Sequence, residues 1–400
     1  MNPDTKPLDE AALQRMRSVM ESHVVAGEMP GMVYAVHRRD RTVVEAIGDQ
    51  SIGGSVMREN TIFRIASMSK PILGVAAMQM VEECLIRLDG PIDYLLPELG
   101  GRAVLRRREG PVDDVVQAGR PMTLRDVLTM RLGLGIVMEW QTRVPFQYAM
   151  EQAGVAPGPS PYWLGHDDFM RGLGALPLVH QPGDGWMYQT GYDVLGVLVA
   201  RAAGKPLGEV LNERVFEPLG MIDTGFFVPP EKIDRFATQY AMGDGGLRVE
   251  DEAAGGWYAG EPAYERAGAE LVSTAGDYLK FCRMMLAGGT LDGVRILSRP
   301  SVELMIMDHT SEAQKRGPDA AMFLGNGGGW GLHVGVNTAR TSAYTNPGRF
   351  GWDGGYGTSG WSDPKEELIG ILLTQRTMDS PQPQKHYVDF WTSAYAAVTD

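Results

Sequence analysis

Cysteine is nearly absent from the chain, which has only Cys84 and Cys282 among 400 residues. Two thiols in separate apolar stretches cannot build the dense disulfide framework of a small secreted domain, so we expect both to be buried and free. Histidine is also sparse: the seven residues are scattered singly, with no pair at the spacing of metal ligands. We therefore expect neither a metal centre nor a cofactor.

Long apolar runs and basic clusters are missing as well. No segment approaches eighteen uninterrupted apolar residues, and the opening MNPDTKPLDE has no apolar region like that of a signal peptide. The formal net charge is -13, and the one basic cluster, Arg106 to Arg108, is followed by acidic residues. We therefore expect a cytoplasmic protein without a membrane or nucleic-acid partner. Nothing in the sequence specifies an oligomeric state.

The composition is that of a folded globular protein, with 44% hydrophobic and 22% charged residues. A chain of 400 residues exceeds the size at which single cores stop growing, so we expect two lobes. Residues 9–26 have apolar positions at helical spacing, and residues 31–48 alternate and turn like a hairpin. Residues 72–81 are apolar on nearly every side, which predicts a buried helix.

The C-terminal part returns to strand patterns and ends in a helix marked by Tyr387, Trp391, Ala394 and Val398. We expect an α/β (α+β) fold in which the terminal segments share one antiparallel sheet flanked by the terminal helices. That domain would comprise residues 1–87 and 290–400, and residues 88–289 would form a mainly helical insertion. The active site is expected between the two lobes.

A serine and a lysine stand three positions apart in FRIASMSKPI, as Ser67 and Lys70. Pro71 is tolerated only in the first turn of a helix, so a helix must begin near Ser67, and residues three apart share one helix face. A lysine can activate a serine if burial lowers the pKa of its amine. A second Ser-x-x-Lys begins at Ser362, but the Asp363-Pro364 that follows predicts a hairpin turn there.

No serine lies in a Gly-x-Ser-x-Gly elbow, so the chain is not an ordinary α/β-hydrolase. Five segments in order instead resemble the serine β-lactamase and penicillin-binding protein superfamily, and most closely class C β-lactamases and family VIII carboxylesterases. The segments are FRIASMSKPI, TLRDVLTMRLGL, QPGDGWMYQTGYDVLG, LVSTAGDYLKFCRMMLAGG and GWDGGYGTSGW. The resemblance spans roughly residues 10 to 380 and implies a β-lactamase-like fold.

The resemblance also implies roles for individual residues. Ser67 would be the acylated nucleophile and Lys70 its partner. The family's Tyr-x-Asn motif falls on Tyr188-Gln189-Thr190, which makes Tyr188 the expected proton shuttle; nearby Tyr192 better suits the packed helix that follows. Lys70 and Tyr188 would titrate as a coupled pair, and the sequence does not decide which is the base.

The third family motif, Lys-Thr-Gly in β-lactamases, is similar in position to Trp352-Asp353-Gly354. In this resemblance the N–H groups of Gly355 and Ser67 form the oxyanion hole.

Two departures bear on the substrate. Trp352 cannot supply the charge with which β-lactamases meet a substrate carboxylate. Arg349 lies three residues earlier, and along a regular strand this odd separation would place it on the opposite face, so it is a poor substitute unless a bulge intervenes. Thr190 also replaces the asparagine that would contact a β-lactam side chain. An uncharged small-molecule ester is therefore the expected substrate.

We expect a serine carboxylesterase that cleaves esters of short to medium acyl chain through a Ser67 acyl-enzyme. The alternatives are a β-lactamase or D-amino-acid peptidase, an acyltransferase, and a non-catalytic protein that binds acyl groups or peptides. Aromatic residues of the helical insertion are candidates for lining the substrate pocket: Trp140, Tyr162, Trp163 and Trp186.

Overall fold

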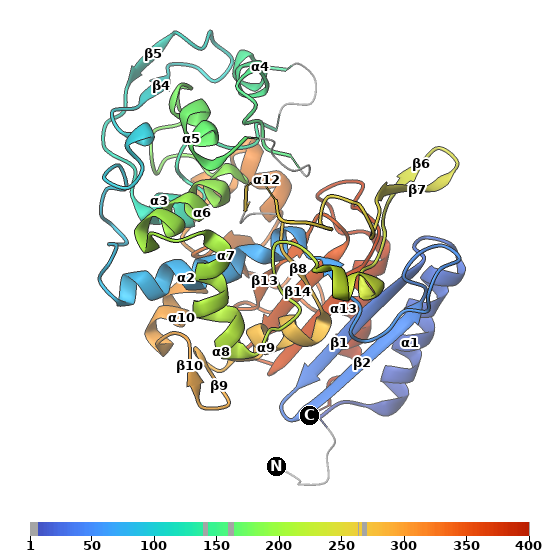
Figure 1. Cartoon of the computed structure of the whole chain (residues 1–400). Coiled ribbons are helices and arrows are strands. Elements are labelled where there is room, and N and C mark those ends of the chain that lie inside the picture. The colour runs from blue at the N-terminus through green and yellow to red at the C-terminus, as the bar shows by residue number, and fades with distance from the viewer. Residues whose placement is uncertain (1–6, 139–142, 159–163, 263, 266–269, 400) are drawn as a thin grey trace.

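A seven-stranded antiparallel sheet organises the protein, with strand order β11-β12-β13-β14-β15-β1-β2 (Figure 1). The computed structural model describes residues 7–138, 143–158, 164–262, 264–265 and 270–399. The strands are β1 (Gly31–Arg38), β2 (Arg41–Gly48), β11 (Gly328–Trp330), β12 (Gly335–Asn337), β13 (Phe350–Gly354), β14 (Thr358–Asp363) and β15 (Leu368–Thr374). Because β1 pairs with β15, the two ends of the chain share one sheet, as the sequence predicts.

The first and last helices, α1 (Glu10–Val25) and α13 (Lys385–Ala396), pack against each other and cover one face of this sheet. Asp9 caps α1 by accepting a hydrogen bond from the backbone N–H of Ala12 at 2.8 Å. The chain ends meet beside these helices, where Leu8 bridges to Val398. The antiparallel sheet with flanking terminal helices is thus confirmed.

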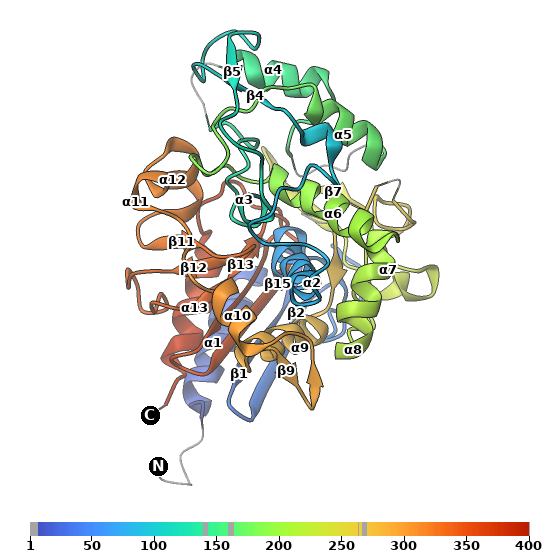
Figure 2. The same cartoon turned by 90° about the vertical axis from the view of Figure 1, so that its left-hand side faces the viewer.

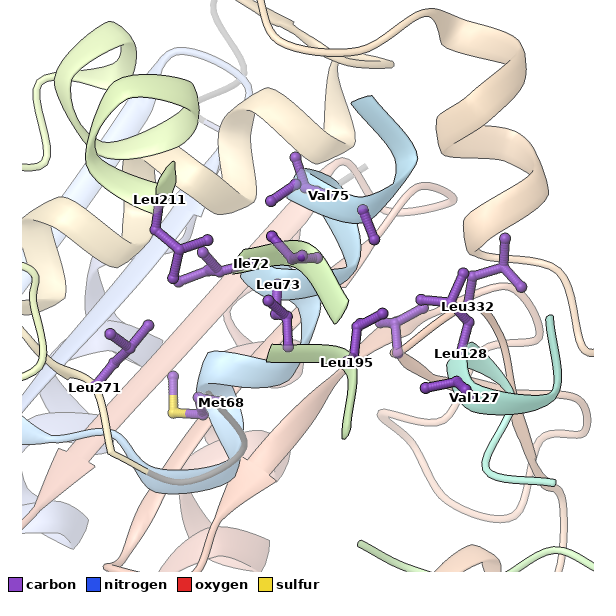
Figure 3. Packing of buried hydrophobic residues seen from close by; sticks show 14 of the residues in the cluster. Met68, Ile72, Leu73, Val75, Val127, Leu128, Leu195, Leu211, Leu271 and Leu332 are labelled. Atoms are coloured by element: carbon purple, nitrogen blue, oxygen red, sulfur yellow. The ribbon is translucent and has the colours of Figure 1, made fainter. Parts of the chain in front are cut away.

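The opposite face is covered by α9 (Ala275–Leu286), which packs on β14, β15 and β1, and by α2 (Lys70–Glu82). Nearly every side of α2 is buried, and Figure 3 shows Ile72, Leu73 and Val75 among leucines of neighbouring segments. The expected helical insertion, residues 88–289, includes α9. In the structure this helix packs on the sheet of the other expected domain.

The helical lobe packs on α2, and its helices α4 and α5 lie farthest from the sheet (Figures 1 and 2). Its main helices are α3 (Leu124–Leu128), α4 (Pro145–Gln152), α5 (His166–Gly174), α6 (Thr190–Ala203), α7 (Leu207–Leu211) and α8 (Glu217–Leu219). Short hairpins interrupt it: β4 (Ala103–Leu105) with β5 (Val115–Gln117), and β6 (Gln239–Gly243) with β7 (Gly246–Asp251). A further hairpin, β9 (Thr290–Leu291) with β10 (Val294–Arg295), leads to α10 (Arg299–Met305), α11 (Glu312–Lys315) and α12 (Pro318–Leu324).

Two local predictions were wrong. Ser362 lies buried in β14 rather than in a turn, because the strand continues through Asp363 before the chain reverses. Cys84 is exposed: α2 ends at Glu82, and Cys84 follows it with a positive φ of 59°. Cys282 is buried and free, as expected. Within the described residues, we find no helix with the length and apolar character needed to span a bilayer.

A buried ion pair fixes the segment that leads to Ser67. Arg64 ends the short strand β3 (Phe63–Arg64), and its Nε donates to Asp251 at 2.8 Å. Both side chains are at most 3% exposed, and the guanidinium lies 4.0 Å from the ring centre of Phe236. The pair connects β3 to the β6–β7 hairpin.

We expect Arg64→Met to lower the free energy of unfolding by about 3–5 kcal/mol, because it leaves the Asp251 carboxylate buried without its cation. Urea denaturation would measure the change. The matched control is Arg171→Met, which breaks an ion pair with Asp168 whose side chains are 69% and 55% exposed. That change should cost less than about 1 kcal/mol. Equal effects of the two substitutions would contradict the prediction.

Candidate active site

Ser67 lies in a single 3₁₀ turn, η1 (Ala66–Ser69), between β3 and α2. Ala66 has a positive φ of 45°, a strained conformation that is often found beside functional residues. Lys70 is the first residue of α2, and its Nζ lies 2.6 Å from Ser67 Oγ in a hydrogen bond. Ser67 is 8% exposed and Lys70 is fully buried. The structure thus brings together the pair that the sequence predicts.

Two aromatic rings lie against the Lys70 amine. The ring centre of Tyr192, in the first turn of α6, is 4.0 Å from Nζ, and that of Tyr188 is 4.9 Å away. A buried cation gains stabilisation from such ring faces. The His333 ring packs against the Tyr192 ring in an edge-to-face contact, with ring centres 4.4 Å apart. Sequence reasoning assigned Tyr192 only a packing role, because nothing in the sequence indicates which face of its ring meets Lys70.

Tyr188 connects the nucleophile to the third motif. Its hydroxyl accepts a hydrogen bond from Trp352 Nε1 at 2.7 Å and also forms one with Ser67. Burial raises the pKa of Tyr188, and the hydrogen bonds with Ser67 and Trp352 offset only part of that effect. The phenol therefore keeps its proton at ordinary pH and is suited to donate it.

Strand β13 comes close to the nucleophile because Gly354 has no side chain. A Cβ on Gly354 would lie 2.4 Å from the carbonyl oxygen of Ile65 and 2.1 Å from Thr358 Oγ1. A Cβ on Gly355, in contrast, would have no neighbour within 4 Å, and this residue lines the cavity described next. The role of the Gly355 N–H in an oxyanion hole stays a prediction.

A cavity of about 690 Å³ opens over Ser67 and is also lined by Tyr188, Trp352 and Gly355. Phe323 of α12 forms part of its wall and stacks on Tyr188 with ring centres 4.3 Å apart. Asp319 holds α12 to the helical lobe: it accepts two hydrogen bonds from Arg108, at 2.5 and 2.7 Å. Residues of both lobes line the cavity, and Phe323 is a lining residue that the sequence analysis did not predict.

The predicted pocket residues lie elsewhere or cannot be placed. Trp186 and Thr190 are buried and do not line the cavity; Trp186 packs against Tyr188 with ring centres 6.0 Å apart. Both belong to the core. Trp140, Tyr162 and Trp163 lie outside the described residues. Among the residues that are described, no three metal-ligating side chains gather in a group.

The geometry agrees with comparisons to known proteins. The sequence profile of the family described as Beta-lactamase matches residues 14–389. The chain belongs to this family. Protein Rv1367c of Mycobacterium tuberculosis is 39% identical to this chain over 361 residues that cover 88% of each chain. Esterase EstB of Burkholderia gladioli is 29% identical over 400 residues, covering 94% of this chain and 93% of EstB.

Solved structures show the same fold. The structure of "EstCE1, a hydrolase with promiscuous acyltransferase activity" superimposes with a TM-score of 0.80. The match covers 97% of this chain and 99% of EstCE1, at 24% sequence identity. This member of the Beta-lactamase family therefore has the β-lactamase-like fold.

The Tyr192 ring provides a test of the Lys70 environment. We expect Tyr192→Leu to lower kcat/KM for p-nitrophenyl butyrate by roughly 30-fold, because a desolvated cation–π contact contributes about 2 kcal/mol to the ammonium that forms when Lys70 accepts a proton during the reaction. Tyr192→Phe, the matched control, keeps the ring and removes a hydroxyl that has no hydrogen-bond partner among the described residues, so the rate should stay near that of the wild type. Similar losses in both variants would refute the role of the ring face.

Proposed function

We propose that the protein is a serine carboxylesterase of family VIII type, acting on esters of short to medium acyl chain. The observation that carries the proposal is the buried contact of 2.6 Å between Lys70 Nζ and Ser67 Oγ, with Tyr188 bonded to the same serine. A serine that shares its hydroxyl with a buried amine and a phenol fits the requirements of an activated nucleophile.

In the proposed reaction Ser67 Oγ attacks the ester carbonyl as its proton passes to Lys70. The N–H groups of Ser67 and Gly355 stabilise the oxyanion of the tetrahedral intermediate. Tyr188 gives its proton to the departing alcohol and regains one from Lys70, which leaves an ester between Ser67 and the acyl group. Water then attacks this acyl-enzyme through the same groups and releases the acid. The raised pKa of Tyr188 favours Lys70 as the first proton acceptor.

An ester fits the third motif better than a β-lactam. The indole N–H of Trp352 is used by Tyr188, and the indole carries no charge to meet a carboxylate next to the reacting carbonyl. Arg349 contacts Trp361 and Trp391 on the side of α13, so its side chain diverges from that of Trp352, as strand alternation predicts. EstB, a relative along most of the chain, is named an esterase.

Acyl transfer is a second candidate, because only the acceptor that attacks the acyl-enzyme distinguishes it from hydrolysis. The structural neighbour EstCE1 is described as having promiscuous acyltransferase activity. The cavity volume of about 690 Å³ leaves room for an acceptor beside a short acyl group. Adding 1-butanol to a p-nitrophenyl butyrate assay and measuring butyl butyrate against butyrate by chromatography would separate the two activities.

Ser67→Ala tests the nucleophile. We expect it to lower p-nitrophenyl butyrate hydrolysis by about 10³-fold or more, because no other group can form the acyl-enzyme. The matched control is Ser362→Ala at the second Ser-x-x-Lys sequence, which should leave the rate within a few-fold of the wild type. A chromogenic cephalosporin measured in parallel should turn over slowly; turnover as fast as ester cleavage would contradict the ester preference.

The pH profile tests the state of Tyr188. Its pKa is raised, so the phenol loses its proton only at a pH above the ordinary tyrosine range, and the proton-donating form is complete below that range. We therefore expect kcat/KM for an ethyl ester, whose alcohol needs a proton, to show no Tyr188-dependent fall up to about pH 10. Tyr188→Phe should lower the rate about 10²-fold or more at every pH. A tyrosine-dependent fall near neutral pH would overturn this role.

A further inference from the structure

Arg349, just before β13, is a buried cation with unused hydrogen-bonding capacity. The residue is 3% exposed, and its guanidinium lies 4.1 Å from the ring centre of Trp391 and 4.5 Å from that of Trp361. Nη1 donates a long hydrogen bond of 3.3 Å to Asn337 Oδ1. Nε and Nη2 have no hydrogen-bond partner among the described residues.

A buried guanidinium keeps its charge, and buried charges are normally paired. Two carboxylates lie in the neighbourhood of Arg349, those of Asp353 and Asp363, yet neither forms an ion pair with it in the described part of the chain. Asp353 accepts hydrogen bonds from Ser359 and Trp361. Asp363 accepts from Asn346 and Tyr395. Two aromatic rings lie against the guanidinium, and of its three nitrogens only Nη1 has an acceptor among the described residues.

This arginine lines the same cavity as Ser67. Other polar residues share that lining near it in sequence: Asn337, Ser342, Tyr344 and Thr345. A series of ring contacts separates the two groups, from Tyr188 to Trp352 at 5.9 Å, then to Trp361 at 6.2 Å, then to the guanidinium. Two indole rings thus stand between the proton shuttle and Arg349, so a substrate group that meets Arg349 lies several bonds from the reacting carbonyl.

We propose that Arg349 forms a subsite for a carboxylate carried at the far end of the ester substrate. This inference rests on the proposed esterase function and narrows its substrate class to esters that carry a distal acid, in place of the uncharged ester that the sequence favours. A carboxylate matches the planar N–H edge of a guanidinium and replaces the long bond to Asn337 by charge-assisted ones.

The first experiment compares acid and capped substrates on the wild-type enzyme. The acid series consists of the p-nitrophenyl monoesters of succinic, adipic, suberic and sebacic acid, and the capped series carries a methyl ester at the distal carboxyl. Release of p-nitrophenolate measures cleavage of the p-nitrophenyl ester alone and not of the methyl ester. We expect kcat/KM to favour the acid by about tenfold or more at one chain length, because charge-assisted hydrogen bonds are about twice as strong as neutral ones.

A second series places the acid on the alcohol side. The butyrate ester of 6-hydroxyhexanoic acid is compared with its methyl-capped form, and released butyrate is measured by chromatography. A preference for the acid in this series alone would place the alcohol portion at Arg349, and a preference in the first series alone would place the acyl portion there. If acid and capped substrates had nearly equal kcat/KM values in both series, the proposed subsite would be wrong.

Arg349→Met is the decisive variant, with Arg349→Lys as the conservative one. In the methionine variant, kcat/KM for the acid substrate divided by kcat/KM for its methyl-capped form (the acid-to-capped ratio) should fall to about one. The rate on p-nitrophenyl butyrate should stay within about threefold of the wild type. The lysine variant keeps the charge without the planar fork and should retain part of the preference. An unchanged ratio in Arg349→Met would sink the proposal.

If Arg349→Met does not fold, inhibition of the wild type decides the matter. Monomethyl suberate, which keeps one free carboxylate, should then inhibit p-nitrophenyl butyrate hydrolysis competitively and more strongly than dimethyl suberate, which has none, and equal inhibition would count against the subsite. Failure of the proposed function looks different, because Ser67→Ala would then leave butyrate hydrolysis unchanged. A flat acid-to-capped ratio with hydrolysis that still depends on Ser67 would remove only the Arg349 subsite.

Discussion

The burial of the Lys70 amine is the constraint on which the rest of the structure depends. Lys70 has no exposed surface, and burying an amine costs free energy unless neighbouring groups replace its contacts with water. Here the hydroxyl of Ser67 and the ring faces of Tyr188 and Tyr192 surround it. These groups come from η1, from the segment before α6 and from α6 itself, so the site exists only when the helical lobe is packed against α2.

The sheet completes the site from the other side. The Trp352 indole on β13 holds the Tyr188 hydroxyl, and the absence of a side chain at Gly354 lets this strand approach the backbone of Ile65. The Arg64–Asp251 pair fixes the same backbone from β7. The helical lobe, strand β13 and the β6–β7 hairpin therefore all contact the few residues around Ser67.

The sequence predicted what depends on local spacing. Ser67 and Lys70 share a helix face, Pro71 marks where α2 begins, and the alternating segments at both ends of the chain predict the sheet. It could not predict contacts that arise only when distant segments meet. The stacking of Phe323 on Tyr188 depends on how α12 is held by Arg108. For the same reason, strand alternation correctly predicts that Arg349 points away from Trp352 but not that one cavity borders both.

Some errors have a more local origin. Asp363-Pro364 was assigned to a turn that included Ser362, but the strand pairs with β15 through Asp363 and turns only afterwards. Trp186 was a candidate pocket residue because large aromatics often line binding sites, whereas its ring packs behind Tyr188. Composition and spacing do not reveal whether an aromatic ring lines the substrate cavity or packs in the core behind the residues that line it.

The bridge between Leu8 and Val398 makes the fold almost circular. If those two residues were joined by a short linker and the chain were opened in the exposed turn between β9 and β10, the strands would occur in the order β11, β12, β13, β14, β15, β1, β2. That is also their order across the sheet. The long-range pairing of β1 with β15 would become a neighbouring pairing, and a sheet now assembled from both ends of the chain would become a simple meander of lower contact order.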